Sequence, residues 1–231
     1  MPRSMMLFAA LALAPALSAA QGPQSDSVVE PKSKRAFPVM LEVAGGSAAH
    51  ILTGTAIRTK TILKVKVYAY GLYVDADAAR DALTRWRGLS AAELAEDDAF
   101  YAALLEDNIG KTLRLVMTRD VGGEDMAEAF DDALAPRIEA YDRDHGTSGG
   151  LRVLEQFRSY FNLEELTKET ELVFTCLPGG RLVTSVAGSV RGELESPALC
   201  WALFDVYLGE NPIMKKGKET VVERMPGVLG G

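Results

Sequence analysis

The chain has 231 residues, with 25 lysines and arginines against 32 aspartates and glutamates, and a formal net charge of −7. This length suffices for one domain with a sizeable core, because domains of roughly 100–250 residues bury most of their apolar surface. The acidic balance argues against a nucleic-acid binder, which needs clustered lysine and arginine. Two cysteines and two histidines exclude a disulfide scaffold and a His/Cys zinc site, so we expect no metal and no cofactor.

The first 20 residues are typical of a targeting segment. Arg3 precedes an apolar run from Met5 to Ala14, and Ser18-Ala19-Ala20 offers small residues at a cleavable position. The run is well short of the roughly 20 apolar residues that span a bilayer, so we expect no stable membrane anchor. We therefore predict a secretory or extracytoplasmic protein, with a plastid as the alternative compartment. Residues 21–35 are polar, contain two prolines and are predicted to form a flexible lead-in.

From Phe37 the pattern changes to short extended runs. Alternation predicts a strand over 37–43, and a β-branched, aromatic stretch predicts a long hairpin over 51–74. In the second arm of the hairpin, one parity is predicted to face the core: Leu63, Val65, Val67, Ala69 and Gly71. The other parity is predicted to face a cleft or solvent: Lys64, Lys66, Tyr68 and Tyr70.

Helices and further strands follow along the chain. Helical spacing and capping residues predict helices over 75–86, 90–105, about 123–138, 149–161 and 196–209. Alternation and turn residues predict strands over 112–121, 171–177, 181–187 and 190–194. Strands interleaved with helices, without regular parallel βαβ units, predict an α+β domain with a mostly antiparallel sheet covered by helices on one side. We place this domain at 36–218 and a tail at 219–231.

Chemistry-bearing motifs are scarce. The sequence has no phosphate-binding loop, no G-x-G-x-x-G and no H-E-x-x-H. The acidic run from Glu124 to Asp132 is best explained as the solvated start of a helix, where negative charge complements the dipole. Cys176 and Cys200 either pair in an oxidising compartment or remain two buried thiols, since their spacing does not show proximity.

Several segments resemble the chalcone isomerase family. The stretch 53–60 with 66–73 resembles the first long hairpin of that family, and 188–196 resembles its last strand. The segment Ser196–Gly209 closely resembles the C-terminal helix of the branch that binds fatty acids in plants. The resemblance spans about 29–218. It implies an open-faced sandwich, in which a large antiparallel sheet is backed by helices and the ligand cleft lies between the layers.

The resemblance also implies a site. In the isomerases an arginine on the first hairpin steers the oxyanion, and Arg58 stands at that position. Tyr68 replaces the isomerase threonine, as in the fatty-acid-binding branch, and neither register of the central helix restores the isomerase tyrosine and asparagine. A guanidinium fork with a nearby phenol suits a carboxylate. Arg58 and Tyr68 are therefore the candidate ligand-binding residues, although an arginine beside a tyrosine is also an ordinary cross-strand pair.

An acyl tail needs an apolar cleft. The possible cleft-lining residues are Leu113, Leu115, Met117, Met126, Phe130 and Leu134. Each of them also fits an ordinary core position. The resulting hypothesis is a monomeric, non-catalytic protein that binds a free fatty acid. The alternatives are an intramolecular lyase of the chalcone–flavanone isomerase type that uses Arg58 as oxyanion stabiliser, and a structural partner with an empty cleft.

Overall fold

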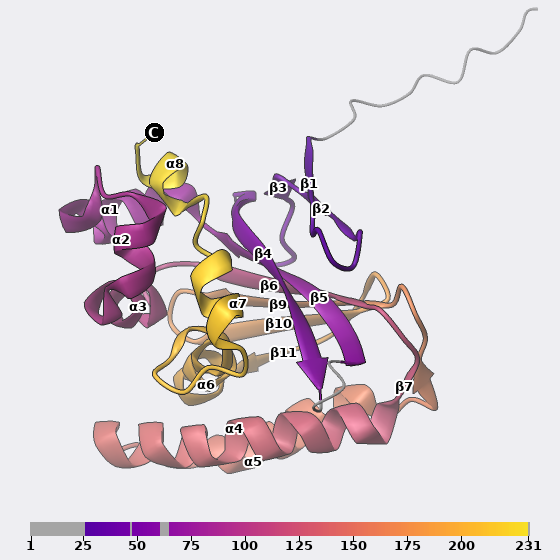
Figure 1. The fold of residues 1–231 in the computed structure, drawn as a ribbon. Coiled ribbons are helices and arrows are strands. Elements are labelled where there is room, and N and C mark those ends of the chain that lie inside the picture. Colours follow the sequence, from indigo (N-terminus) through magenta and orange to yellow (C-terminus); the bar gives the residue numbers. More distant parts are fainter. Residues whose placement is uncertain (1–25, 47, 61–64, 231) are drawn as a thin grey trace, which may run out of the picture.

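A computed structural model describes residues 26–46, 48–60 and 65–230. The predicted targeting segment, together with Leu63 and Lys64 of the hairpin, lies outside the described residues. A seven-stranded antiparallel sheet forms the centre, in the order β11-β10-β9-β6-β5-β4-β3, and helices pack against it (Figure 1). The predicted α+β architecture is confirmed.

Most strands follow the predicted runs, but the predicted strands 37–43 and 112–121 are each divided between two sheets. The large sheet consists of β3 (Met40–Leu41), β4 (His50–Lys60), β5 (Val65–Val74), β6 (Lys111–Met117), β9 (Glu171–Leu177), β10 (Arg181–Val186) and β11 (Ser189–Glu195). Two small antiparallel pairs are β1 (Ser27–Val29) with β2 (Ala36–Pro38), and β7 (Val121–Gly122) with β8 (Glu165–Leu166). The long β4–β5 hairpin therefore lies next to the centre of the sheet.

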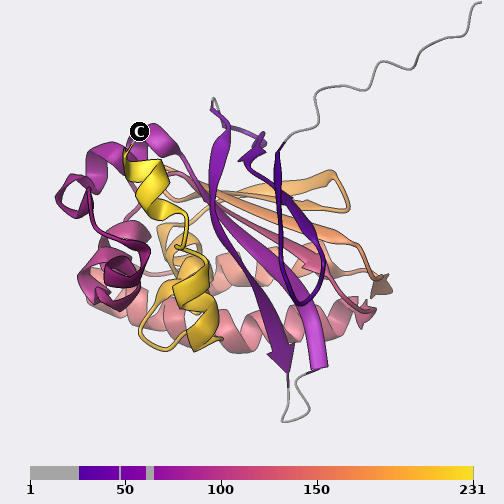
Figure 2. The same ribbon diagram turned by 45° about the horizontal axis from the view of Figure 1, so that its top comes forward.

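The helices form a layer on one face and a group at one end. They are α1 (Ala76–Ala82), α2 (Ala91–Glu96), α3 (Asp98–Leu105), α4 (Gly123–His145), α5 (Gly150–Arg158), α6 (Pro197–Leu208), α7 (Lys215–Thr220) and α8 (Met225–Gly230). The helices α4, α5 and α6 cover the sheet, and α1 to α3 gather at one end of the molecule (Figures 1 and 2). Within the described ranges, no helix combines the length and the apolar character that crossing a membrane requires.

Local signals explain several helix boundaries. The Ser90 hydroxyl accepts from the backbone N–H of Glu93, whose carboxylate accepts in return from Ser90, so the predicted capping box is present. The predicted helix over 90–105 is divided at Asp97, which caps α3 through the N–H of Phe100. Ser196 caps α6 in the same way, so its start is confirmed.

Hydrophobic cores lie on both faces of the sheet. Tyr68, Tyr70 and Leu72 of β5 point into the larger core beneath the helices. Ala69 and Tyr73 point into a smaller core on the outer face, which also contains Phe37 of β2. Of the two predicted surroundings, solvent is wrong, because Tyr68 and Tyr70 are only 7% and 0% exposed, whereas a cleft between the layers stays a prediction.

The chain ends are also more ordered than predicted. Residues 27–29 form β1 rather than a flexible lead-in, and the Glu30 carboxylate accepts from the backbone N–H groups of Lys32 and Ser33. At the other end, the predicted tail contains α8, and Val222 and Met225 are fully buried. Both segments bury apolar surface against the sheet or its helices, which their sequence patterns alone do not reveal.

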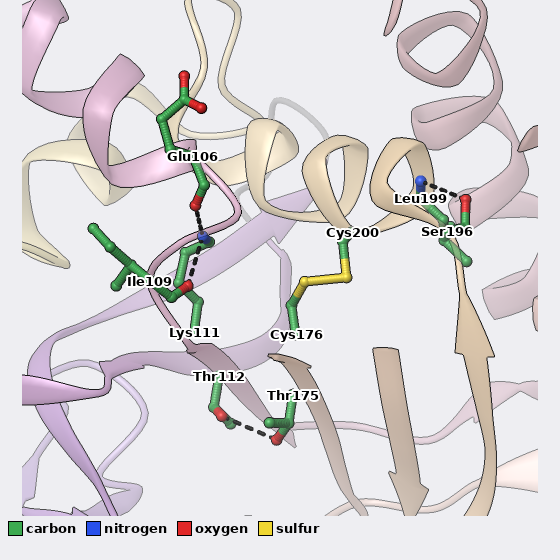
Figure 3. The surroundings of a disulfide bond; sticks show 9 residues. All are labelled: Glu106, Ile109, Lys111, Thr112, Thr175, Cys176, Ser196, Leu199 and Cys200. Carbon is green, nitrogen blue, oxygen red and sulfur yellow. Dashed lines mark hydrogen bonds between the residues drawn. A yellow bond between two sulfur atoms is a disulfide. The ribbon is translucent and has the colours of Figure 1, made fainter. Parts of the chain in front are cut away.

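A disulfide joins the two layers. Cys176 at the end of β9 and Cys200 in α6 are bonded, at a sequence separation of 24 (Figure 3). Both cysteines are 3% exposed. The bond decides between the two alternatives that their spacing left open, and it holds α6 against the end of β9 on the helix-facing side of the sheet.

Candidate functional site

Arg58 and Tyr68 are brought together by the β4–β5 hairpin. They are direct cross-strand partners in the antiparallel register. Their strand neighbours Ala56 and Tyr70 belong to the larger core, so this end of the hairpin presents both residues to the helix-facing side. The structure therefore places the two predicted ligand-binding residues side by side between the layers.

Among the described residues, only part of the Arg58 guanidinium donates hydrogen bonds to the protein. Its Nη1 donates to the carbonyl of Thr59 at 2.9 Å and to that of Ile213 at 3.2 Å, and lies 3.6 Å from the sulfur of Met214. Among the residues that the structure describes, no carboxylate forms an ion pair with Arg58. The side chain is half-buried. An arginine that lacks an internal counter-charge is a natural anion-binding group.

Three tyrosines adjoin this arginine. The hydroxyl oxygens of Tyr68 and Tyr207, the latter in α6, are 2.9 Å apart and share one hydrogen bond. The Tyr70 ring lies 4.8 Å from that of Tyr207 and 6.1 Å from that of Tyr68, between centroids. Within the described ranges, the buried Tyr70 hydroxyl has no hydrogen-bond partner, and it lies against Gly217 in α7. The cluster therefore gathers residues from the hairpin and from two C-terminal helices.

Burial determines the charge state of the phenols. It raises the pKa of Tyr68, and the hydrogen bond from Tyr207 and the charge of Arg58 offset only part of the rise. Burial likewise raises the pKa of Tyr70 and Tyr207, and the neighbouring phenols raise them further. All three phenols are therefore neutral near pH 7 and keep their O–H groups as donors.

The six predicted cleft-lining residues lie in the larger core. Leu113, Leu115 and Met117 extend from β6, and Met126, Phe130 and Leu134 extend from α4. All are at most 7% exposed. The structure thus brings them together between sheet and helices, while their role as walls of a cleft stays a prediction.

A surface hollow of about 800 Å³ lies elsewhere, among α3, the C-terminal half of α4, and α6. Its walls include Tyr141, Trp201 and the disulfide. None of the predicted binding residues lines it. The hollow and the arginine–tyrosine cluster are therefore separate features.

Sequence reasoning missed Tyr207 as a member of the cluster. The signal was present, because Tyr207 continues the four-residue spacing of Leu199 and Leu203 along the buried side of α6. Its partner Tyr68 is 139 residues away in sequence, so the pairing is visible only after folding.

The fold and the cluster define an α+β protein of the open-faced sandwich type, with a guanidinium and three phenols where the layers meet. A family model described as chalcone isomerase like matches residues 48–222. The chain belongs to this family, which confirms the resemblance that its motifs indicated.

Individual relatives lie in both branches of the family. The chain is 28% identical to fatty-acid-binding protein 1 of Arabidopsis thaliana over 204 residues, which cover 86% of this chain and 70% of that protein. It is also 28% identical to a chalcone–flavanone isomerase of Hordeum vulgare, over 84% of this chain and 87% of that enzyme. A crystal structure of an Arabidopsis thaliana fatty-acid-binding protein superposes with a TM-score of 0.73 at 26% identity, covering 88% of this chain and 99% of that one.

Proposed function

We propose that this protein binds a free fatty acid without transforming it. The carboxylate accepts hydrogen bonds from Arg58 and Tyr68, and the acyl chain lies between the sheet and the helices. The observation that carries the proposal is a half-buried guanidinium beside buried neutral phenols, with no carboxylate paired to it among the described residues. The similarity to fatty-acid-binding proteins supports the choice of ligand.

The surroundings of the pair suit an apolar tail. Leu115 and Met117 of β6 extend into the larger core from the strand next to β5, and Phe130 of α4 belongs to the same core. An acyl chain that enters between these elements exchanges water for hydrocarbon, which contributes about 0.8 kcal/mol per buried CH₂ group. A ligand without an acyl chain gains nothing comparable here.

We also propose that the N-terminal segment directs the chain to a secretory or extracytoplasmic compartment, where it works as a monomer. The disulfide between Cys176 and Cys200 supports an oxidising compartment. Fluorescent-protein fusions with and without residues 1–20 test the compartment, and a plastid signal would contradict this part of the proposal. Sedimentation analysis tests the monomer.

The ligand is tested in two steps. Protein purified from cells is extracted and its bound lipids are identified by mass spectrometry. After delipidation, decanoate, laurate, palmitate and oleate are titrated calorimetrically into the wild type and Arg58→Gln, with the alcohol of the tightest acid as a neutral probe. We expect Arg58→Gln to weaken acid binding by about 10- to 100-fold, because it removes charge-assisted hydrogen bonds.

The neutral alcohol provides the internal control, since it should bind the wild type and Arg58→Gln equally. Exposed Arg119 provides the matched protein control, and Arg119→Gln should bind like the wild type. Absence of both co-purified and titrated fatty acid would overturn the proposal. Turnover of naringenin chalcone above the solution rate, lost in Arg58→Gln, would instead support the isomerase alternative.

A further inference from the structure

The donors around Arg58 outnumber the acceptors that the protein offers them. Tyr68 and Tyr207 share one hydrogen bond, so one of their two O–H groups remains free to donate. Among the described residues, the Tyr70 hydroxyl is fully buried and has no hydrogen-bond partner. Arg58 directs only its Nη1 group at protein acceptors among the described residues. Two phenol donors and most of a guanidinium fork therefore remain available in one place.

An unpartnered buried hydroxyl is costly unless something uses it. Leaving such a group without a hydrogen bond typically costs about 1–3 kcal/mol, so native interiors rarely keep one. Space at the Tyr70 hydroxyl is kept by Gly217, where any side chain would collide with it. The protein thus maintains a donor at this point without supplying an acceptor.

The charge of the cluster restricts what it can accept. Among the described residues, Arg58 is the charged group that acts on the three phenols, which are themselves neutral. A carboxylate brings one negative charge and about four lone-pair sites, which matches this set. A phosphate monoester near pH 7 brings about two negative charges, which leaves a net charge in a largely buried site, and an alcohol leaves the guanidinium uncompensated.

We propose that Tyr70 and Tyr207 complete the head-group site with Arg58 and Tyr68, and that this four-residue cluster selects a singly charged carboxylate over phosphate esters and alcohols. The inference rests on the proposed function and assigns selectivity within that site to two residues beyond the Arg58–Tyr68 pair. Tyr207 acts by donating to the carboxylate directly or by turning the Tyr68 hydroxyl towards it. Tyr70 supplies the donor that the protein itself leaves unused.

Tyr70→Phe and Tyr207→Phe test the inference, because phenylalanine keeps each ring and removes only the hydroxyl. Tyr73→Phe is the matched control: Tyr73 lies on the same strand, is fully buried and has an unpartnered hydroxyl, but faces the opposite side of the sheet. Delipidated full-length variants are titrated calorimetrically with laurate, dodecanol and dodecyl phosphate.

Each of the two test variants is expected to weaken laurate binding by about tenfold and to leave dodecanol binding unchanged. Tyr73→Phe is expected to bind all three probes like the wild type. The thermal midpoint of Tyr70→Phe should not fall, since its hydroxyl has no partner to lose, so a folding defect does not obscure the result.

The outcomes separate the two proposals. Wild-type laurate affinity in both Tyr70→Phe and Tyr207→Phe, with binding still lost in Arg58→Gln, overturns the inference and leaves the proposed function standing. Equal affinity of the wild type for laurate and dodecyl phosphate also overturns the selectivity claim. Failure of the wild type to bind any fatty acid overturns the proposed function itself.

Discussion

Two arginines on neighbouring parts of the central sheet, Arg58 of β4 and Arg114 of β6, lie on its opposite faces. On the helix-facing side, Arg58 lies beside Tyr68 and Tyr70 with no carboxylate paired to it among the described residues. On the outer face, Arg114 of β6 forms a two-pronged ion pair with Glu171 of β9. Arg114 also donates to the Ala36 carbonyl at 3.1 Å and lies over the ring of Phe37.

The partners of the two arginines distinguish a structural role from a proposed binding role. The chain supplies a counter-charge, a carbonyl and an aromatic face to Arg114, so this arginine fastens the β1–β2 hairpin to the sheet. Among the described residues, Arg58 donates only to two backbone carbonyls and a thioether. The same residue type therefore serves as an internal fastening on one face and, in the proposed function, as an anion-binding group on the other.

The largest loss of stability should come from breaking the disulfide on the helix-facing side of the sheet. Reduction of the Cys176–Cys200 disulfide frees α6, which carries Tyr207, from β9. We expect the free energy of unfolding to fall by about 3–4 kcal/mol, since the bond closes a loop of 24 residues. Urea denaturation with and without dithiothreitol measures the loss.

A Cys176→Ala/Cys200→Ala variant is the control, because its stability should not respond to dithiothreitol. If the comparison between the faces holds, reduction should also weaken laurate binding, since Tyr207 is no longer held against Tyr68. Coincident denaturation curves for the oxidised and reduced wild type would contradict the expectation.

Lowering the pH should destabilise the protein through His50, which lies on the outer face of the sheet. His50 is buried and bonded through Nδ1 to Thr112, whose hydroxyl also contacts Thr175, and burial lowers the pKa of His50 to about 4. In the unfolded chain this pKa is near 6.5, so the unfolded state gains a proton first as the pH falls. Stability is thus lost between about pH 6.5 and 4, by about 3 kcal/mol.

The unfolding free energies of wild type and His50→Gln, measured at intervals from pH 7 to pH 4, isolate this contribution from that of the carboxylates. The advantage of the wild type at pH 7 should shrink by about 3 kcal/mol at pH 4, because glutamine takes up no proton. Parallel curves for the two proteins would show that His50 titrates normally in the fold.

Much of this arrangement could be predicted from local signals. The predicted strands 171–177 and 181–187, separated by the turn residues 178–180, pair as β9 and β10, and the four-residue spacing from Met126 predicted the buried side of α4. Caps such as Ser196 determined where helices begin. These features depend on residues within a few positions of one another, where propensity and hydrogen bonding act directly.

The orientation of the hairpin was not predictable in the same way. The alternation of side chains along β5 separates its two faces. It does not reveal that both faces are covered, or that the larger core lies on the side of the helices. The large rings of Tyr68 and Tyr70 consequently lie in the main core. Val65, which was predicted to face the core, is instead exposed. The Tyr68–Tyr207 pair depends on how α6 docks, which is a tertiary property.

The smallest effect tests the outer-face arginine directly. Glu171→Gln removes the counter-charge of Arg114 but keeps one acceptor, and Glu171 is 43% exposed, so solvent screens part of the loss. We expect the unfolding free energy to fall by about 1 kcal/mol, with laurate affinity unchanged. Glu193→Gln, which breaks the more exposed pair with Arg181, is the matched control and should cost less. A laurate affinity that falls with Glu171→Gln would mean that the two faces are energetically coupled, and the division between fastening and binding would no longer hold.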